Sequence, residues 1–218
     1  MTPYRRPHIP PRKYFTPEGT PIHYGERWAG LDGPPEDTYS VTHNPGRFAP
    51  LHDIADALIQ WLDQNFQATA EEDTAFASDL LHPTEDVQRS IRITPTEPGS
   101  APLTFVLTSV PSVLIHAGLL VDLRFPSCGC DACDETWESA AEDMEWHVHR
   151  VVFGEFTERV SRRITGTEFH SGFSDADGCR RSMTQARGYP QVRLNAARKL
   201  LAGGHSWDPW PLVEEGTA

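Results

Sequence analysis

The spacing of apolar and polar residues changes along the chain, and each change predicts a new element of structure. From Pro50 onward the apolar residues recur at steps of three and four, which is the pattern of an amphipathic helix. They are Leu51, Ile54, Ala55, Leu58, Ile59, Leu62 and Phe66. Pro50 suits the first turn of that helix. An acidic loop at residues 71–73 and a short helix around Thr74 to Leu81 are expected next.

Between residues 89 and 124 the spacing becomes two, as in β-strands whose side chains point alternately to opposite faces of a sheet. The breaks at Pro95–Pro102, Val110–Pro111 and Ala117–Gly118 divide this stretch into four strands. Connections this short join antiparallel neighbours, so the pattern predicts a four-stranded antiparallel meander.

The helical spacing returns after residue 134 and shifts to another face near Gly154, which predicts a kink or a break there. The shifted face holds Phe153, Phe156 and Val160. A strand over 164–169, a polar loop over 171–181 and a helix over 190–201 are expected to follow. The tail carries Trp207 and Trp210, which we expect to dock on the body.

The first 50 residues contain ten of the nineteen prolines, which excludes a long helix or a central strand. Residues 1–48 are therefore predicted to form an irregular arm that wraps the body, with residues 1–20 loose. Residues 49–218 are predicted to form one α+β domain. The expected fold is a four-stranded antiparallel meander with helices packed on one face and this Pro-rich arm.

Charge is distributed unevenly. The formal net charge is −12, and residues 51–150 hold eighteen acidic and four basic side chains, a sum of −14. This sign argues against nucleic acid or an anionic membrane as a partner. No apolar run approaches the length of a membrane helix, and no apolar stretch of a signal peptide follows Met1, so a cytoplasmic location is expected.

The segment with specific chemistry is Cys128-Gly-Cys-Asp-Ala-Cys133. Three thiols at this spacing can converge on one ion, because Gly129 allows a tight turn. Zinc is the first choice, with an iron–sulfur cluster or copper(I) as softer alternatives. The predicted helix start after Cys133 favours its thiolate form. A disulfide among these cysteines, or free thiols, is the competing interpretation.

A tetrahedral site needs a fourth ligand besides Cys128, Cys130 and Cys133. Cys179 is favoured, because it lies in the predicted polar loop, whose position is free. The alternatives are His170, Asp131 and a water molecule. Distance along the predicted elements excludes His116, His147 and His149.

These features predict a binding or accessory protein with a structural zinc ion, acting on an unknown protein partner or small molecule. A thiolate-rich site is usually closed, which favours a structural metal over a catalytic one. The alternative is an enzyme, either a zinc-dependent hydrolase or a thiol redox protein that uses the same cysteines. No phosphate-binding, dinucleotide-binding or serine-hydrolase motif is present in the sequence.

Two segments, Arg47–His52 and Phe125–Glu135, carry a family resemblance. The chain resembles an uncharacterised family of high-GC bacteria, domain of unknown function number 6226, from about Tyr24 to about Leu212. The run C-G-C-D-A-C-D-E is the most specific part of this resemblance. The resemblance implies a single bacterial domain without an assigned activity, and it supplies no catalytic residues.

Overall fold

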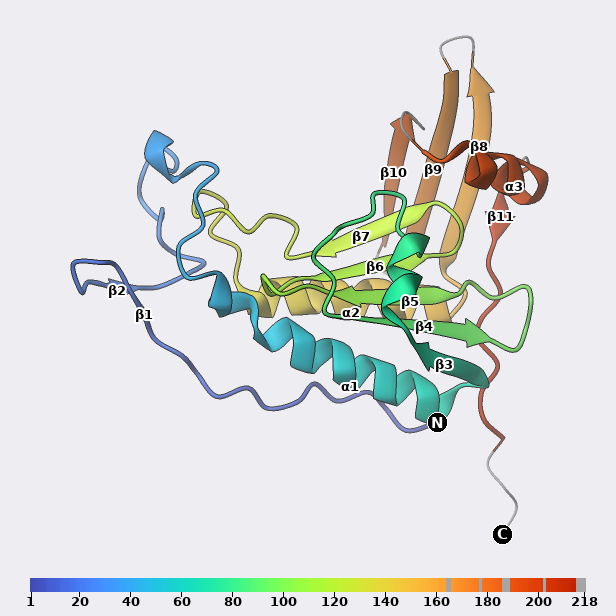
Figure 1. Ribbon diagram of the computed structural model, residues 1–218, viewed down its shortest axis with the longest axis horizontal. Helices are drawn as coiled ribbons and strands as arrows, with labels where there is room; N and C mark the ends of the chain where they lie inside the picture. The colour runs from blue at the N-terminus through green and yellow to red at the C-terminus, as the bar shows by residue number, and fades with distance from the viewer. Residues whose placement is uncertain (164–165, 177, 186–188, 202, 215–218) are drawn as a thin grey trace.

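The computed structural model describes residues 1–163, 166–176, 178–185, 189–201 and 203–214. The fold is α+β, and a five-stranded antiparallel sheet in the order β3-β4-β5-β6-β7 lies at its centre. The strands are β3 (Ala68–Glu72), β4 (Arg89–Pro95), β5 (Leu103–Leu107), β6 (Val113–Ala117) and β7 (Val121–Phe125). The predicted meander is confirmed as β4 to β7, and β3 extends it by one edge strand (Figure 1).

Strand β3 occupies part of the segment that was expected to be an acidic loop. Four of its five residues are exposed, so it lacks the apolar alternation that identifies a half-buried strand. Pairing with β4 stabilises the strand instead. Glu71 lies opposite Arg92 of β4, and Arg89 of β4 donates to the carboxylate of Glu72 at 3.0 and 3.3 Å.

Helices α1 (Pro50–Asn65) and α2 (Trp137–Val152) share one apolar core with the inward side chains of the sheet. The short 3-10 helix η3 (Thr74–Asp79) covers the opposite face, where Ala77 and Leu80 pack on Val106 and Leu114. Figure 1 shows α2 behind the sheet and η3 in front of it. The predicted helix over Pro50–Phe66 is confirmed.

Helix α2 ends at Val152, and the break expected near Gly154 is found there. Gly154 has a φ of +74°, and a Cβ at this position would lie 2.7 Å from the backbone nitrogen of Pro209, so glycine is required. The expectation that a helical face continues through Phe156 and Val160 is wrong. Both residues lie in strand β8 (Phe156–Arg163).

A second antiparallel sheet has the order β10-β9-β8-β11, with β9 (Gly166–Asp175), β10 (Gly178–Gln185) and β11 (His205–Ser206). The strand expected over 164–169 is present from Gly166, and residues 164–165 lie outside the described part of the chain. The predicted polar loop over 171–181 is wrong, because β9 and β10 pair there. All of β10 is exposed, which explains its polar sequence.

The predicted C-terminal helix is confirmed as α3 (Gln191–Leu201). The tail docks as expected, since Trp207 and Trp210 are both buried. Their indole N–H groups donate to Glu158 Oε2 at 2.8 Å and to the Ala101 carbonyl at 2.9 Å. Among the described residues, no helix combines the length and apolar character needed to cross a membrane.

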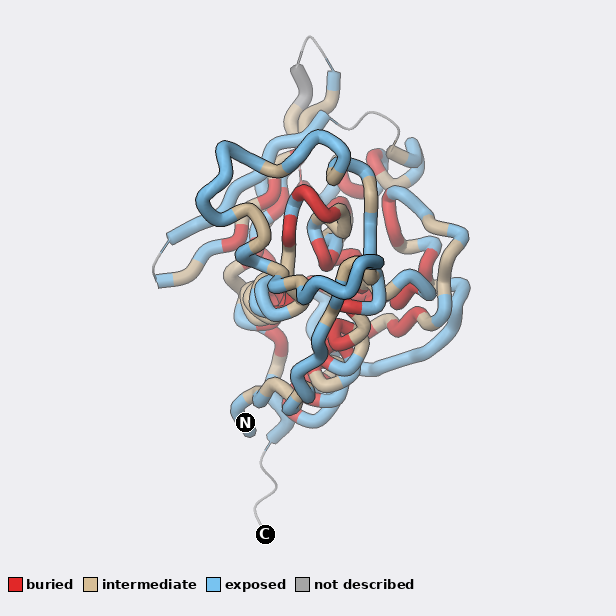
Figure 2. Tube along the Cα trace, turned by 90° about the vertical axis from the view of Figure 1, so that its left-hand side faces the viewer, coloured by how far each residue is buried: buried red, intermediate tan, exposed pale blue. Residues whose placement is uncertain are grey.

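The N-terminal arm contains the strands β1 (Tyr14–Phe15) and β2 (Pro21–Ile22) and the 3-10 helices η1 (Glu36–Thr38) and η2 (Pro45–Phe48). Figure 2 shows its largely exposed trace outside the buried centre. The expectation that residues 1–20 are loose is wrong at the start of the chain. Thr2 bonds to Trp61 and Asn65, and the Tyr4 hydroxyl donates to Glu145 at 2.9 Å.

Candidate metal centre

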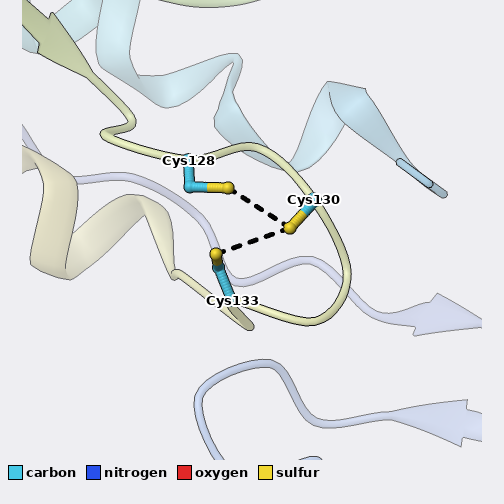
Figure 3. A group of neighbouring side chains, drawn as sticks. All are labelled: Cys128, Cys130 and Cys133. Carbon is cyan, nitrogen blue, oxygen red and sulfur yellow. Dashed lines mark hydrogen bonds between the residues drawn. The ribbon is translucent and has the colours of Figure 1, made fainter. Parts of the chain in front are cut away.

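The three clustered cysteines lie in the loop between β7 and α2, and their side chains point toward one another (Figure 3). The Sγ atoms of Cys128 and Cys130 are 3.2 Å apart, and those of Cys130 and Cys133 are 3.4 Å apart. All three Sγ atoms lie within 4.8 Å of one another. The spacing in the sequence thus produces the convergence that was expected from it, and the group could hold a metal ion.

The backbone of this cysteine loop, residues 128–133, is held by the N-terminal arm. The N–H of Asp131 donates to the carbonyl of Val41 at 2.8 Å, and the N–H of Ala132 donates to the carbonyl of Thr38 at 3.1 Å. The indole N–H of Trp28 donates to the carbonyl of Asp131 at 3.2 Å. The arm therefore fixes the turn that brings the thiols together.

Asp131 is the buried residue at the centre of the contact between the arm and the cysteine loop, with 1% of its surface exposed. Its carboxylate accepts from the backbone N–H of His43 at 3.2 Å and meets His43 Nδ1 at 2.5 Å. Guanidinium nitrogens of Arg27 and Arg47 lie 3.5 and 3.7 Å from Oδ1. Charged neighbours of this kind compensate the cost of removing the carboxylate from water.

Arg47 is equally buried, at 1% exposure. Its two Nη atoms donate to the carbonyls of His43 at 2.8 Å and Gly129 at 2.9 Å. The guanidinium carbon lies 4.3 Å from the ring centroids of both Tyr24 and Phe48. Arg47 thus joins the arm to the glycine between the first two cysteines.

The acidic residues of the segment turn toward N–H groups. Glu135 accepts from the Ser127 N–H at 3.0 Å, the Ser127 hydroxyl at 2.8 Å and the Cys128 N–H at 2.9 Å. Asp134 accepts from the Arg27 N–H at 2.8 Å and has a φ of +51°. Glu135 closes the cysteine loop onto the start of α2, and Asp134 joins it to the arm.

The thiols influence each other's ionisation. Hydrogen bonds from Cys128 and from the backbone of Cys133 lower the pKa of Cys130 to about 7. Hydrogen bonding with Cys128 and Cys130 raises the pKa of Cys133 to about 12. The expectation that a helix start favours the Cys133 thiolate is wrong, because α2 begins at Trp137 with Thr136 as its N-cap. Cys130 therefore ionises more readily than Cys133.

The cluster opens on a shallow hollow of about 630 Å³, lined by Cys128, Cys133, Asp134, Glu135 and Asp143 among others. Zinc–sulfur bonds of about 2.3 Å in a tetrahedron place thiolate sulfurs roughly 3.8 Å apart. The pairs Cys128–Cys130 and Cys130–Cys133, at 3.2 and 3.4 Å, would need to separate by about 0.5 Å. This shift is small for side chains that are half-buried or exposed.

The structure does not group the other predicted protein ligands with the three thiols. Cys179 is exposed on β10 opposite Ser174, and the described residues that could share a metal site with Cys128, Cys130 and Cys133 do not include it. The β9–β10 pairing, rather than a free loop, sets its position. The imidazole of His170 bonds to the Ser161 hydroxyl at 3.1 Å, and the carboxylate of Asp131 faces the arm.

Sequence reasoning missed the residues that hold the loop. Arg27, His43 and Arg47 lie 80 or more positions before their partners in the cysteine loop. Such pairings leave no periodic signal, although Arg47 falls within one of the two segments that carry the family resemblance.

Comparison with known families gives one match. The model of a family of unknown function (DUF6226) matches residues 10–214. No curated protein and no solved structure matches the chain.

Proposed function

The chain belongs to DUF6226, a family of unknown function, and we propose that it is an accessory protein in which Cys128, Cys130 and Cys133 hold a structural zinc ion. The observation that carries this proposal is the convergence of three Sγ atoms within 4.8 Å. Thiolates are soft ligands that favour zinc among the abundant divalent metals.

The role of the ion is to fix the turn on which the arm docks. Without a metal, three thiols at this distance repel one another as soon as more than one ionises. A divalent cation removes that repulsion and stabilises the turn. The hydrogen bonds from Asp131 and Ala132 to the arm then extend this effect to residues 38–41.

The first experiment measures metal content and affinity in the full-length protein. Elemental analysis is expected to give one zinc per chain. The variant Cys130→Ser should lower the affinity, measured by competition with a chromophoric chelator, on the order of 100-fold, because roughly 10–16 kcal/mol is shared among about four ligands. Protein purified without metal that also fails to take up zinc would reject the proposal.

Cys179→Ser is the matched control, since it removes an exposed thiol outside the cluster. Unchanged stoichiometry and affinity are expected, with water completing the coordination. A loss equal to that of Cys130→Ser would instead restore Cys179 as the fourth ligand.

A second experiment tests the structural role. Removal of the metal by a chelator should speed tryptic cleavage after Arg27, because this residue binds Asp134 and lies 3.5 Å from Asp131. Cleavage after Arg198 on α3 serves as the internal control. Equal acceleration at both positions would indicate general unfolding, whereas no change at either would show that the ion does not hold the arm.

A thiol redox protein is the second candidate, favoured by the separation of 3.2 Å between the Sγ atoms of Cys128 and Cys130. Thiol counting by mass spectrometry separates the two functions. A bound metal protects three thiols from alkylation until a chelator is added. A redox function instead gives metal-free protein that loses two cluster thiols to a disulfide under mild oxidation.

A further inference from the structure

A row of polar side chains crosses the central sheet on the face opposite α1 and α2. The register places Arg92 of β4 opposite Thr104 of β5, Thr104 opposite His116 of β6, and His116 opposite Asp122 of β7. Neighbouring positions on the same face, Val106 and Leu114, are apolar and buried under η3. The polar row therefore needs a reason other than exposure to solvent.

His116 and Asp122 form a fixed pair within this row. His116 is 6% exposed, and its Nδ1 lies 2.7 Å from Asp122 Oδ1. The other oxygen of Asp122 accepts from the backbone N–H groups of Leu81 at 2.8 Å and His82 at 3.3 Å. A carboxylate held in this way sets the imidazole tautomer with its proton on Nδ1.

The remaining ring nitrogen of His116 is available to a ligand. Nε2 has no hydrogen-bond partner among the described residues, and His116 lines a cavity of about 300 Å³. An Asp–His pair on a cavity wall, whose Nε2 has no partner among the described residues, can accept a hydrogen bond from a bound molecule.

Two arginines supply positive charge to the same cavity. Arg92 binds Asp79 through Nε and Nη2, both at 2.7 Å, and Thr104 also donates to Asp79 at 2.7 Å. Arg193 of α3 donates to the backbone carbonyls of Ser78 and Asp79. A guanidinium has five N–H groups, so each arginine retains donors. With Asp79 as the acidic side chain in the wall, the lining carries one positive charge in excess.

We propose that this cavity binds a small oxyanion that also carries a hydroxyl group. The hydroxyl donates to His116 Nε2, and the oxyanion lies against Arg92 and Arg193. A phosphate and a 2-hydroxycarboxylate share this chemistry. The site is separate from the thiol centre and does not depend on the proposed zinc ion.

The test uses histidine resonances of the full-length protein, recorded by NMR with ¹⁵N-labelled histidine. Without a ligand, His116 is expected in the Nδ1–H tautomer. Inorganic phosphate and glycolate are then titrated separately. Perturbation of His116 by phosphate identifies a phosphate site, and perturbation by glycolate identifies a carboxylate site. An Nε2–H tautomer, or no perturbation by either probe with a dissociation constant below roughly 10 mM, would overturn the proposal.

Variants test the same assignment. Arg193→Gln should weaken binding of the effective probe about tenfold, the loss of one charge-assisted contact. His82→Gln is the control, because His82 is exposed, lies next to the His116–Asp122 pair and is outside the cavity lining. Equal affinity in Arg193→Gln and the unmodified protein would reject the oxyanion contact. Arg92→Gln is the second variant, used if Arg193→Gln does not fold. It removes the other guanidinium of the cavity wall and should also weaken binding, so unchanged affinity would reject the site.

Discussion

Asp131 and Glu158 are equally buried, at 1% exposure each, but they are compensated by different means. Asp131 lies among the side chains of His43, Arg27 and Arg47, all of which can carry positive charge. Glu158 accepts from the N–H groups of Leu119, Leu120 and Trp207 at 2.8 to 3.1 Å, and within the described part of the chain it makes no ion pair.

The two carboxylates also join different parts of the molecule. Asp131 links the N-terminal arm to the cysteine loop through charged groups. Glu158 links the turn at Gly118 to the C-terminal tail through neutral donors. Gly118 has a φ of +63°, and a Cβ there would collide with Glu158 Oε2. Burial alone therefore does not set the energetics of a carboxylate, because its partners decide whether the charged form is stable.

The neutral partners of Glu158 also affect its ionisation. Burial raises the pKa of Glu158 to about 7, although the backbone N–H groups of Leu120 and Leu119 and the indole N–H of Trp207 lower it. Neutral donors therefore offset only part of the desolvation cost. Stability that depends on Glu158 should vary with pH near neutrality.

The largest effect is expected at Asp131. Asp131→Asn keeps the shape of the side chain but leaves Arg27 and Arg47 without their carboxylate. Breaking a buried ion pair in this way costs about 3–5 kcal/mol. The free energy of unfolding in urea, with zinc present, measures the loss.

The control for Asp131→Asn is Asp32→Asn, an exposed acidic position in the arm, where a change below about 0.5 kcal/mol is expected. If Asp131→Asn does not fold, Arg47→Met tests the same pair from the other side. A loss at Asp131 no larger than that at Asp32 would show that the buried charges contribute little.

Glu158→Gln is expected to remove a pH dependence. The folded-state pKa of about 7 lies above the ordinary value of 4.5, so the folded state binds the proton more tightly than the unfolded state. Stability is then highest below about pH 4.5 and falls as the pH rises through 7. The total fall is roughly 3 kcal/mol at most. Unfolding curves between pH 4.5 and 8 should show this fall in the unmodified protein but not in Glu158→Gln.

The free energy of unfolding of Glu158→Gln is subtracted from that of the unmodified protein at each pH, so that the contributions of other titrating groups cancel. Glu85→Gln, at an exposed position, should retain the pH dependence of the unmodified protein. Parallel curves for the unmodified protein and Glu158→Gln would mean that the three N–H donors fully compensate the buried charge.

The sequence was most informative about the helices and strands that have one buried face. Helix α1 and the strands β4 to β7 were recognised because core packing imposes a spacing of 3.6 or 2 on their apolar residues. Strands β3 and β10 were missed because nearly all their side chains are exposed. Their stability comes from backbone pairing with a neighbouring strand, which leaves little trace in the local sequence.

The candidate metal centre was predictable from the sequence only where it depends on neighbouring residues. The convergence of Cys128, Cys130 and Cys133 follows from local spacing, whereas the pairing of Asp131 with Arg47 joins distant segments and required the structure. His116 was excluded as a metal ligand because of its distance from the cysteines. Its pairing with Asp122, six residues along the chain, could have been inferred from the register of the tight β6–β7 hairpin.

The smallest expected effect concerns Trp207, whose indole N–H donates to Glu158. Trp207→Phe keeps an aromatic ring against Phe156 and removes this donor. The cost should grow with pH, from about 1 kcal/mol near pH 5 to about 2 kcal/mol near pH 8, because a hydrogen bond to an ionised acceptor is stronger than one to a neutral acceptor. Trp210→Phe is the matched control. Its indole donates to the backbone carbonyl of Ala101, which does not titrate, so its cost should be the same at both pH values. If the cost of Trp207→Phe in unfolding free energy is also the same at pH 5 and pH 8, Glu158 does not ionise in this range. The two buried carboxylates would then differ only in their partners.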